Sequence, residues 1–215
     1  MERLIELAKR IKDKELRKKV IDFLKDPKLS HKEFKKYPRM KIEEAGSMFT
    51  VTSPQGGVAV ERDVLNHTIA LVDLCLKTAD SLEKNYEILI NQDHLIAAAI
   101  LHDIGKIFEW KKTKGGFEPT GVLLDHTMLG TAELYRREFP EKVIHIVASH
   151  FGESGPTPPR TFEALILHYC DTLLSLIEFH LYGSKSQAQQ PVQLVVLDES
   201  ALKKISETEK NKEKP

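Results

Sequence analysis

The sequence of 215 residues is poor in cysteine and contains no long uninterrupted apolar run. Two cysteines, Cys75 and Cys170, are too few for a disulfide-rich secreted scaffold. Both lie in apolar segments, so we expect buried thiols in a reducing compartment. The longest apolar runs, such as 95–101, fall far short of the ~20 residues that a membrane-spanning helix needs. The N-terminus has no apolar signal-peptide core. We therefore expect a cytoplasmic protein that does not engage a membrane.

An excess of charge of one sign is also missing, because 32 Lys and Arg balance 32 Asp and Glu. Taken alone, this balance argues against a strong nucleic-acid binder. It hides an asymmetry, however. Residues 1–41 contain 15 Lys and Arg against 7 Asp and Glu, and the remainder is acidic by the same margin. Such a basic segment can pack on the acidic remainder or offer a patch to a phosphate backbone, so an RNA substrate stays open.

What the sequence does contain is helical periodicity. With 41% hydrophobic residues, the chain is long enough to bury one sizeable core. Apolar residues recur at helical spacing in six segments: 3–26, 63–82, 93–104, 122–139, 141–150 and 161–182. The stretches 46–57, 112–121 and 152–159 contain glycine and proline and predict loops, the first with at most a short strand. The sequence thus predicts an all-α fold.

The same pattern divides the chain into three parts. We expect a basic helical segment, 1–45, that packs on the core, and a main domain, 46–185. Residues 186–215 follow as a polar linker and a charged, disordered tail. Within this last part, 193–198 has the pattern of a short strand or of the start of a helix.

The most informative segment is ILHDIGK, residues 100–106. An apolar helix ends there in the adjacent pair His102 and Asp103. A buried pair of this kind needs partners, because an unpaired buried charge is costly. A lysine or arginine can pair with the carboxylate, or a metal ion can bind both side chains. Nitrogen and oxygen ligands together suit Mn, Fe, Co, Ni or Zn better than Mg.

Further metal-competent side chains lie on the apolar faces of other predicted helices. They are His67, His126, His150 and Asp171. Any one of them alone could be a hydrogen-bonded core residue. Five helices or helix ends that each present one such group inward favour a shared metal site instead.

In this order of residues the sequence resembles the HD superfamily of metal-dependent phosphohydrolases, whose pattern is H…HD…D. Two further histidines mark the members of that superfamily that can hold two metals. The stretches LNHTIALV (65–72), AAAILHDIGKIFEW (97–110), LLDHTMLGTAEL (123–134), IVASHFGE (146–153) and PRTFEALILHYCDTL (159–173) look like the HD region of YhaM-type 3′–5′ exoribonucleases. The resemblance covers about residues 10–182. It implies an HD-domain helical bundle with a metal site at its centre.

The resemblance also implies a set of ligands and two catalytic residues. His67, His102, Asp103 and Asp171 match ligands of a first metal, with Asp103 as the bridge. His126 and His150 match ligands of a second metal. Lys106 matches a lysine that contacts a phosphate or the attacking water, so Asp103 and Lys106 are the expected catalytic residues.

Substrate contacts at the mouth of the site are a separate expectation. Ser149 and Arg160 are candidates for it, although Arg160 can equally be a surface residue. Two features depart from the family. Phe151 stands where the family has a second histidine, and we expect no OB-type nucleic-acid domain, which argues against processive action on long RNA.

The function that follows is hydrolysis of phosphodiester bonds in RNA 3′ ends, short oligonucleotides or cyclic nucleotides. A hydroxide activated by two divalent ions, with manganese favoured, would attack phosphorus. The alternatives are a nucleotidase that acts on phosphomonoesters, and a metal-bound module without turnover. The expected partner is the RNA or nucleotide substrate, and self-association into a homo-oligomer is left open.

Overall fold

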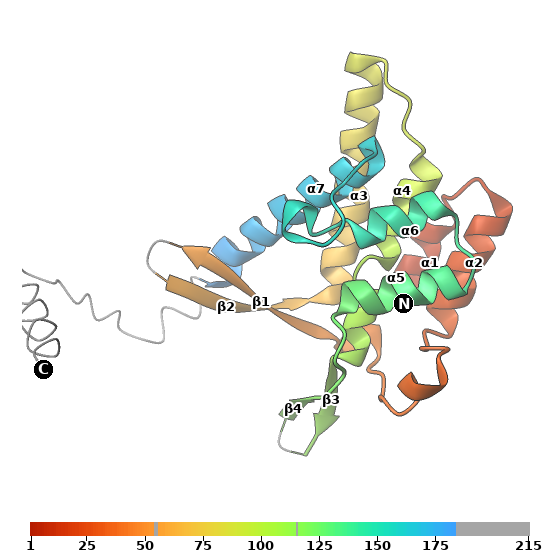
Figure 1. Cartoon of the computed structure of the whole chain (residues 1–215). Helices are drawn as coiled ribbons and strands as arrows, with labels where there is room; N and C mark the ends of the chain where they lie inside the picture. Colours follow the sequence, from red (N-terminus) through yellow and green to blue (C-terminus); the bar gives the residue numbers. More distant parts are fainter. Residues whose placement is uncertain (54–55, 115, 184–215) are drawn as a thin grey trace, which may run out of the picture. The chain divides into compact units, whose positions relative to one another are not determined.

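The computed structural model describes residues 1–53, 56–114 and 116–183, and these form one all-α bundle, as predicted (Figure 1). The helices are α1 (Glu2–Ala8), α2 (Lys14–Lys25), α3 (Val64–Tyr86), α4 (Gln92–Leu101), α5 (His126–Arg136), α6 (Glu141–Ala148) and α7 (Phe162–Glu178). Short 3₁₀ segments lie at Lys32–Phe34, Ile42–Glu44, Ile104–Phe108 and Gly152–Ser154, and a π-helical turn, Phe179–Gly183, follows α7. The segments predicted at 186–215 and 193–198 lie outside the described residues.

Helix α4 lies at the centre of the bundle and packs against α1, α2, α3, α6 and α7. Every residue from Leu95 to Leu101 is buried. A helix that is apolar on all sides can only be stable when other helices surround it. The side chain of Asn91 caps its first turn by accepting a hydrogen bond from the backbone N–H of His94. The C-terminal end of α4, where His102 follows, therefore lies inside the protein.

The N-terminal segment forms two helices, so the prediction of one helix over 3–26 is wrong. The chain breaks after α1 because Asp13 caps α2, accepting hydrogen bonds from two backbone N–H groups of its first turn. The backbone N–H groups of Lys12 and Asp13 donate to the carboxylate of Asp93, each at 2.8 Å. Both helices still contribute to the core, for example through Leu4 and Val20.

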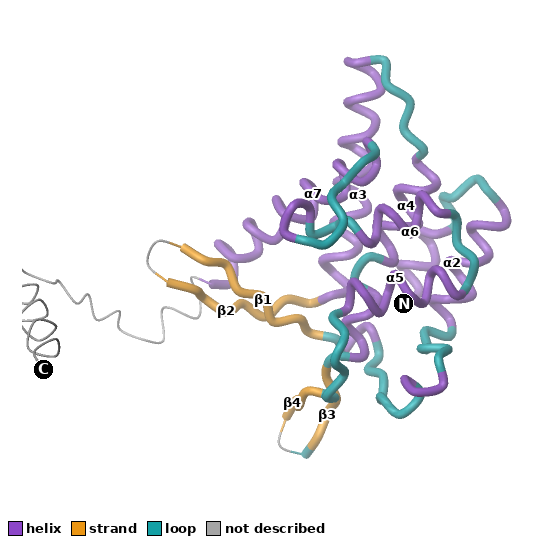
Figure 2. Tube along the Cα trace, in the orientation of Figure 1, coloured by secondary structure: helices purple, strands orange, loops and turns teal. Residues whose placement is uncertain are grey.

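Two antiparallel β-hairpins extend from the bundle (Figure 2). Strand β1 (Gly46–Ser53) pairs with β2 (Gly56–Asp63), and β3 (Trp110–Thr113) pairs with β4 (Gly116–Pro119). Loops were predicted over most of these residues, and the two hairpins correct that prediction. Two extended runs that follow each other closely in the sequence form a hairpin when they pair with each other. The first hairpin leads directly into α3 and places Arg62 beside it.

Helix α5 begins at His126, later than the predicted start at 122. The side chain of Asp125 accepts a hydrogen bond from the backbone N–H of Met128 and so defines the first turn. His126 therefore stands at the helix N-terminus. Leu123, which falls inside the predicted helix, lies outside the observed one and is exposed.

Helix α7 buries one face and exposes another. Ala164, Leu167 and Cys170 are buried, whereas an apolar stripe on the outside is exposed; it comprises Phe162, Leu165, Tyr169, Leu173 and Leu176. By length and composition, Phe162–Tyr182 is the one helix in the described chain that could cross a membrane. We did not expect it, because polar residues interrupt its apolar runs.

The two cysteines are buried and free, as predicted. Cys75 on α3 and Cys170 on α7 lie in contact, with the Cys75 thiol as hydrogen-bond donor. This bond raises the pKa of Cys75 and lowers the pKa of Cys170 to about 7. The two thiols thus lie where α3 packs against α7.

Candidate metal centre

Six side chains that the sequence singled out meet inside the bundle. His67 comes from α3, His102 and Asp103 from the end of α4, His126 from the start of α5, His150 from the end of α6, and Asp171 from α7. Their nitrogen and oxygen atoms form two groups, and within each group the atoms lie within 4.8 Å of one another. The first group is His67, His102 and Asp171, and the second is Asp103, His126 and His150.

Asp103 lies between the two groups. Its Oδ2 is 3.3 Å from Nε2 of His102, and its Oδ1 is 3.3 Å from Nε2 of His126. One carboxylate oxygen therefore faces each group. This is the position that a ligand shared by two metal ions must occupy.

Two buried cations also contact Asp103. Its Oδ2 accepts hydrogen bonds from Lys106 Nζ at 2.8 Å and from Arg62 Nη2 at 2.9 Å. Burial alone would raise the pKa of Asp103, but the charges of His102 and Lys106 outweigh burial and hold that pKa well below its usual range. The pairing of the carboxylate with lysine and arginine, which the sequence left open, is thus present. It satisfies Oδ2 only, because Oδ1 has no hydrogen-bond partner among the described residues.

Backbone carbonyls orient two of the imidazoles. His102 Nδ1 lies 2.9 Å from the carbonyl oxygen of Ala99, and His150 Nδ1 lies 2.8 Å from that of Val147. A carbonyl can only accept, so Nδ1 of each ring donates a hydrogen bond, and Nε2 is the nitrogen left to bind a metal. Burial lowers the pKa of His150 to about 4, which keeps that ring neutral at neutral pH.

Carboxylates orient the other two imidazoles. His67 Nδ1 lies 3.1 Å from Glu178 Oε1, and His126 Nδ1 lies 3.0 Å from Glu109 Oε1. Each group thus contains one histidine backed by a carboxylate and one backed by a carbonyl. Such outer partners fix the ring and raise its basicity as a metal ligand.

The residues fit a divalent transition metal. Nε2 of His102 and Nε2 of His126 are buried, and neither has a hydrogen-bond partner within the described residues. His67 Nε2 lies 3.0 Å from Asp171 Oδ1, and two ligands bound at 2.0–2.2 Å to one ion lie about 3.0–3.4 Å apart. Four imidazoles with two carboxylates are the donor set that Mn, Fe, Co, Ni or Zn accepts.

The electrostatics of Asp171 agree with a ligand role. Burial raises the pKa of Asp171, but a hydrogen bond with His67 and the charge of His102 together lower this pKa by more than burial raises it. The pKa of Asp171 therefore lies below its usual range. The carboxylate is therefore ionised at neutral pH, as metal binding requires.

The residues predicted to contact substrate have different positions. Lys106 is buried and directed at Asp103. The prediction for Ser149 needs correction, because its side chain is fully buried and its hydroxyl donates to the carbonyl of His145 at 2.7 Å. Arg160 is exposed, and its backbone N–H donates to His145 Nε2 at 3.1 Å. Within the described residues, no hydrogen bond or ion pair joins Arg160 to the two groups.

Four residues of the site were missed from the sequence. They are Arg62, Glu109, Glu178 and His168, whose Nδ1 lies 2.8 Å from the carbonyl oxygen of His150. A signal existed for Glu178, which stands seven residues after Asp171 and so shares its helix face. Arg62 had none, because it lies between the loop predicted at 46–57 and the helix predicted at 63–82.

Comparison with known proteins gives the family. The family model described as HD domain matches residues 64–176, more than half of the chain. The chain belongs to the HD family. This HD protein is 46% identical over 173 residues to the dihydroneopterin 2′,3′-cyclic phosphate phosphodiesterase of Methanocaldococcus jannaschii, which covers 80% of this chain and 67% of that protein.

More distant relatives of this HD protein are exoribonucleases. The 3′–5′ exoribonucleases YhaM of Geobacillus sp. and Bacillus subtilis are 33% and 31% identical over 119 residues, half of this chain. The matched region spans about a third of their length, 35% and 36%. No solved structure matches. The HD protein is therefore a metal-dependent phosphohydrolase, as the sequence resemblance implied.

Proposed function

We propose that this HD phosphohydrolase opens a small cyclic phosphodiester, a 2′,3′-cyclic phosphate. The observation that carries the proposal is the Asp103 carboxylate, held between two groups of metal-competent side chains. The relative that is 46% identical supports the cyclic diester, because its name gives this class of substrate. RNA 3′ ends have weaker support, from relatives that match over half of the chain.

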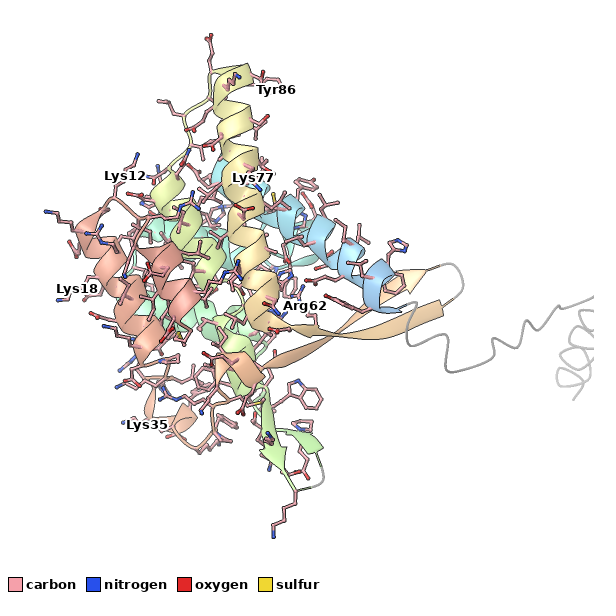
Figure 3. All side chains as sticks on the ribbon, turned by 180° about the vertical axis from the view of Figure 1, so that it is seen from behind. Lys12, Lys18, Lys35, Arg62, Lys77 and Tyr86 are labelled. Carbon is pink, nitrogen blue, oxygen red and sulfur yellow. The ribbon has the colours of Figure 1, made fainter. Side chains whose placement is uncertain are left out.

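The placement of the basic N-terminal segment favours a small substrate over long RNA. Figure 3 shows Lys12, Lys18 and Lys35 projecting outward from this segment, apart from Arg62 near the end of β2. Lys19 Nζ is used internally, since it donates to the carbonyl of Glu138 at 2.6 Å. The basic side chains of residues 1–41 therefore give no support to a long RNA substrate.

The chain's own residues supply charge and orientation. When bound, divalent ions polarise a phosphate and lower the pKa of water. Lys106 and Arg62 place two positive charges beside Asp103, where they can offset the negative charge that grows on the phosphoryl oxygens. Burial strengthens this effect, because the local dielectric constant is low. Glu178 and Glu109 keep His67 and His126 from rotating.

The reaction itself is a simple hydrolysis. Water adds to phosphorus, one phosphorus–oxygen bond of the cyclic phosphate breaks, and the freed sugar oxygen takes up a proton. The product is a phosphomonoester. Whether the enzyme also hydrolyses monoesters is decided by the same assay that tests the proposal.

That assay uses purified protein stripped by a chelator and reloaded separately with Mn, Fe, Co, Ni or Zn. The substrates are a 2′,3′-cyclic nucleotide, 3′-labelled RNA and a panel of 5′-monophosphates. We expect hydrolysis of the cyclic nucleotide. Asp103→Ala should lose bound metal and hydrolysis together, whereas Asp73→Ala, an exposed carboxylate paired with Lys77, should keep both.

Four results would contradict the proposal. Hydrolysis of monophosphates alone would assign a nucleotidase, and hydrolysis of RNA alone would assign an exonuclease. Metal-loaded protein that hydrolyses none of the substrates would indicate a binding module. Full turnover by Asp103→Ala would show that the site itself is wrongly assigned.

A further inference from the structure

The aromatic ring of Phe151 lies directly against the second group of ligands. Its ring centroid is 4.4 Å from that of His150, with the planes tilted by 34°, and 5.4 Å from that of His126, with the planes at 73°. The side chain is nevertheless 42% exposed. One part of the ring therefore packs on the histidines while the rest is open to solvent.

Contacts with His168 on α7 hold the loop that carries Phe151 in place. The carbonyl oxygen of His150 lies 2.8 Å from Nδ1 of His168, so this ring forms a hydrogen bond with the backbone just before Phe151. Gly152 has a positive φ of 62°, and a Cβ at this position would lie 2.4 Å from the His168 ring. The backbone on both sides of Phe151 is thus tied to α7. A ring fixed in this way needs little ordering when a ligand packs on it.

The residues close in sequence to Phe151 and His126 include exposed apolar and acidic side chains. Leu124 and Met128, two residues before and two residues after His126, are 39% and 44% exposed. The next ionisable side chain after Phe151 is the exposed carboxylate of Glu153. Neither feature attracts a string of phosphates. An exposed aromatic ring beside a phosphate-hydrolysing centre instead suits a flat, largely uncharged group on the same molecule.

We infer that Phe151 is a specificity-determining residue that stacks on a planar heterocycle, a purine or a pterin, attached to the cyclic phosphate. This inference rests on the proposed function and names its substrate class. The cyclic phosphate lies at the two groups of ligands, and the heterocycle lies on the open part of the Phe151 ring. Phe151 has no ionisable group, so it takes no part in proton transfer.

The test compares two substrates that differ in the heterocycle. One is guanosine 2′,3′-cyclic phosphate, and the other is glycerol 1,2-cyclic phosphate, which has no ring system to stack. Phe151→Ala should raise KM about 5- to 150-fold for the nucleotide, the range for loss of one stacked base. Its kcat/KM for the glycerol ester should stay within about threefold. Phe151→Tyr should behave like the wild type on both.

A second measurement does not depend on turnover. Calorimetry should show that Phe151→Ala binds guanosine 3′-monophosphate more weakly by the same factor, with metal content unchanged. Tyr135→Ala, which removes an aromatic side chain that is 76% exposed near the other end of α5, should have no effect in either assay.

The outcomes separate this inference from the proposed function. If Phe151→Ala lost kcat/KM equally on both substrates, Phe151 would only support His150. If it lost kcat/KM on neither, Phe151 would not contact the substrate. If wild-type protein hydrolysed neither cyclic diester, the proposed function would fail. The calorimetric comparison would then still decide whether Phe151 binds a heterocycle.

Discussion

Glu178 Oε1 lies 3.1 Å from Nδ1 of His67, so a carboxylate at the end of α7 orients an imidazole on α3. Glu178 stands one turn of helix beyond Ser175, whose hydroxyl accepts a hydrogen bond from Arg62 at 3.0 Å. The last two turns of α7 therefore orient side chains around the first group.

The first prediction concerns this carboxylate. Glu178→Gln should lower metal affinity about 10- to 100-fold, because a neutral amide orients and polarises His67 less well. The affinity can be measured by titration against a competing chelator, with circular dichroism as a check of folding. Glu163→Gln on the same helix, which keeps an acceptor for the backbone N–H of Asn91, should bind metal like the wild type. Equal affinities of all three proteins would contradict the role given to Glu178.

The second prediction concerns two glycines. A Cβ at Gly105 would lie 2.3 Å from the carbonyl oxygen of His126, so Gly105→Ala should displace the start of α5 and cost about 1–3 kcal/mol of stability. At Gly130, within α5, a Cβ would make only an ordinary contact at 3.8 Å with Val147. Gly130→Ala should therefore stabilise the protein by about 0.5–1 kcal/mol. Urea denaturation measures the change in the free energy of unfolding for both variants. Changes of the same sign for Gly105→Ala and Gly130→Ala would contradict the prediction.

The third prediction concerns metal removal. Chelation should abolish hydrolysis but leave the protein folded, because Arg62 and Lys106 still compensate the charge of Asp103. Arg62→Met breaks a buried ion pair and should destabilise the stripped protein by about 3–5 kcal/mol. The loss should be smaller in metal-loaded protein, where ions supply positive charge.

Urea denaturation with and without chelator gives the four free energies of unfolding that this comparison needs. Arg39→Met serves as the control, since Arg39 pairs with Asp26 at the exposed surface and should contribute less than about 1 kcal/mol in either state. Losses of equal size in stripped and loaded Arg62→Met would show that the arginine does not compensate for missing metal.

The fourth prediction concerns pH. Burial, and then the charge of Arg160, lower the pKa of His145 below its ordinary value of 6.5. The unfolded chain therefore binds a proton at a higher pH than the folded protein does, and stability falls as pH drops below 6.5. Protonation also removes Nε2 as the acceptor for the backbone N–H of Arg160.

His145→Gln removes this titration, so its melting temperature should fall less than that of the wild type between pH 7.5 and pH 5. The raised pKa of His67 acts in the opposite direction, but it is common to both proteins and cancels in the difference. Parallel curves for the two proteins would mean that His145 titrates alike in the folded and unfolded states.

Strong local signals in the sequence were read correctly. The apolar run 95–101 predicted a buried helix, and the structure places α4 at the centre of the bundle. The six histidines and aspartates predicted to converge do so. Helix boundaries were less accurate, because side-chain caps such as Asp13 and Asp125 decide where a helix begins.

Other features could not be read locally. Ser149 was predicted to contact substrate at the mouth of the site, but its hydroxyl turns back onto α6. Arg62 was not singled out, although it contacts Asp103 across 41 positions of sequence. A charged residue gives no sign in the sequence of whether it will be buried, since its partner is chosen by packing.

The sequence by itself determined where most of the helices form and which side chains are able to bind metal, because helical periodicity and ligand chemistry are properties of short segments. Only the tertiary structure decided the rest. It set the two groups on either side of Asp103, placed Glu178 and Glu109 behind their histidines, and left the ring of Phe151 open beside His150. The contacts of Glu178 with His67 and of Glu109 with His126 join residues that are distant in sequence, and the close packing of the elements that carry them fixes these contacts.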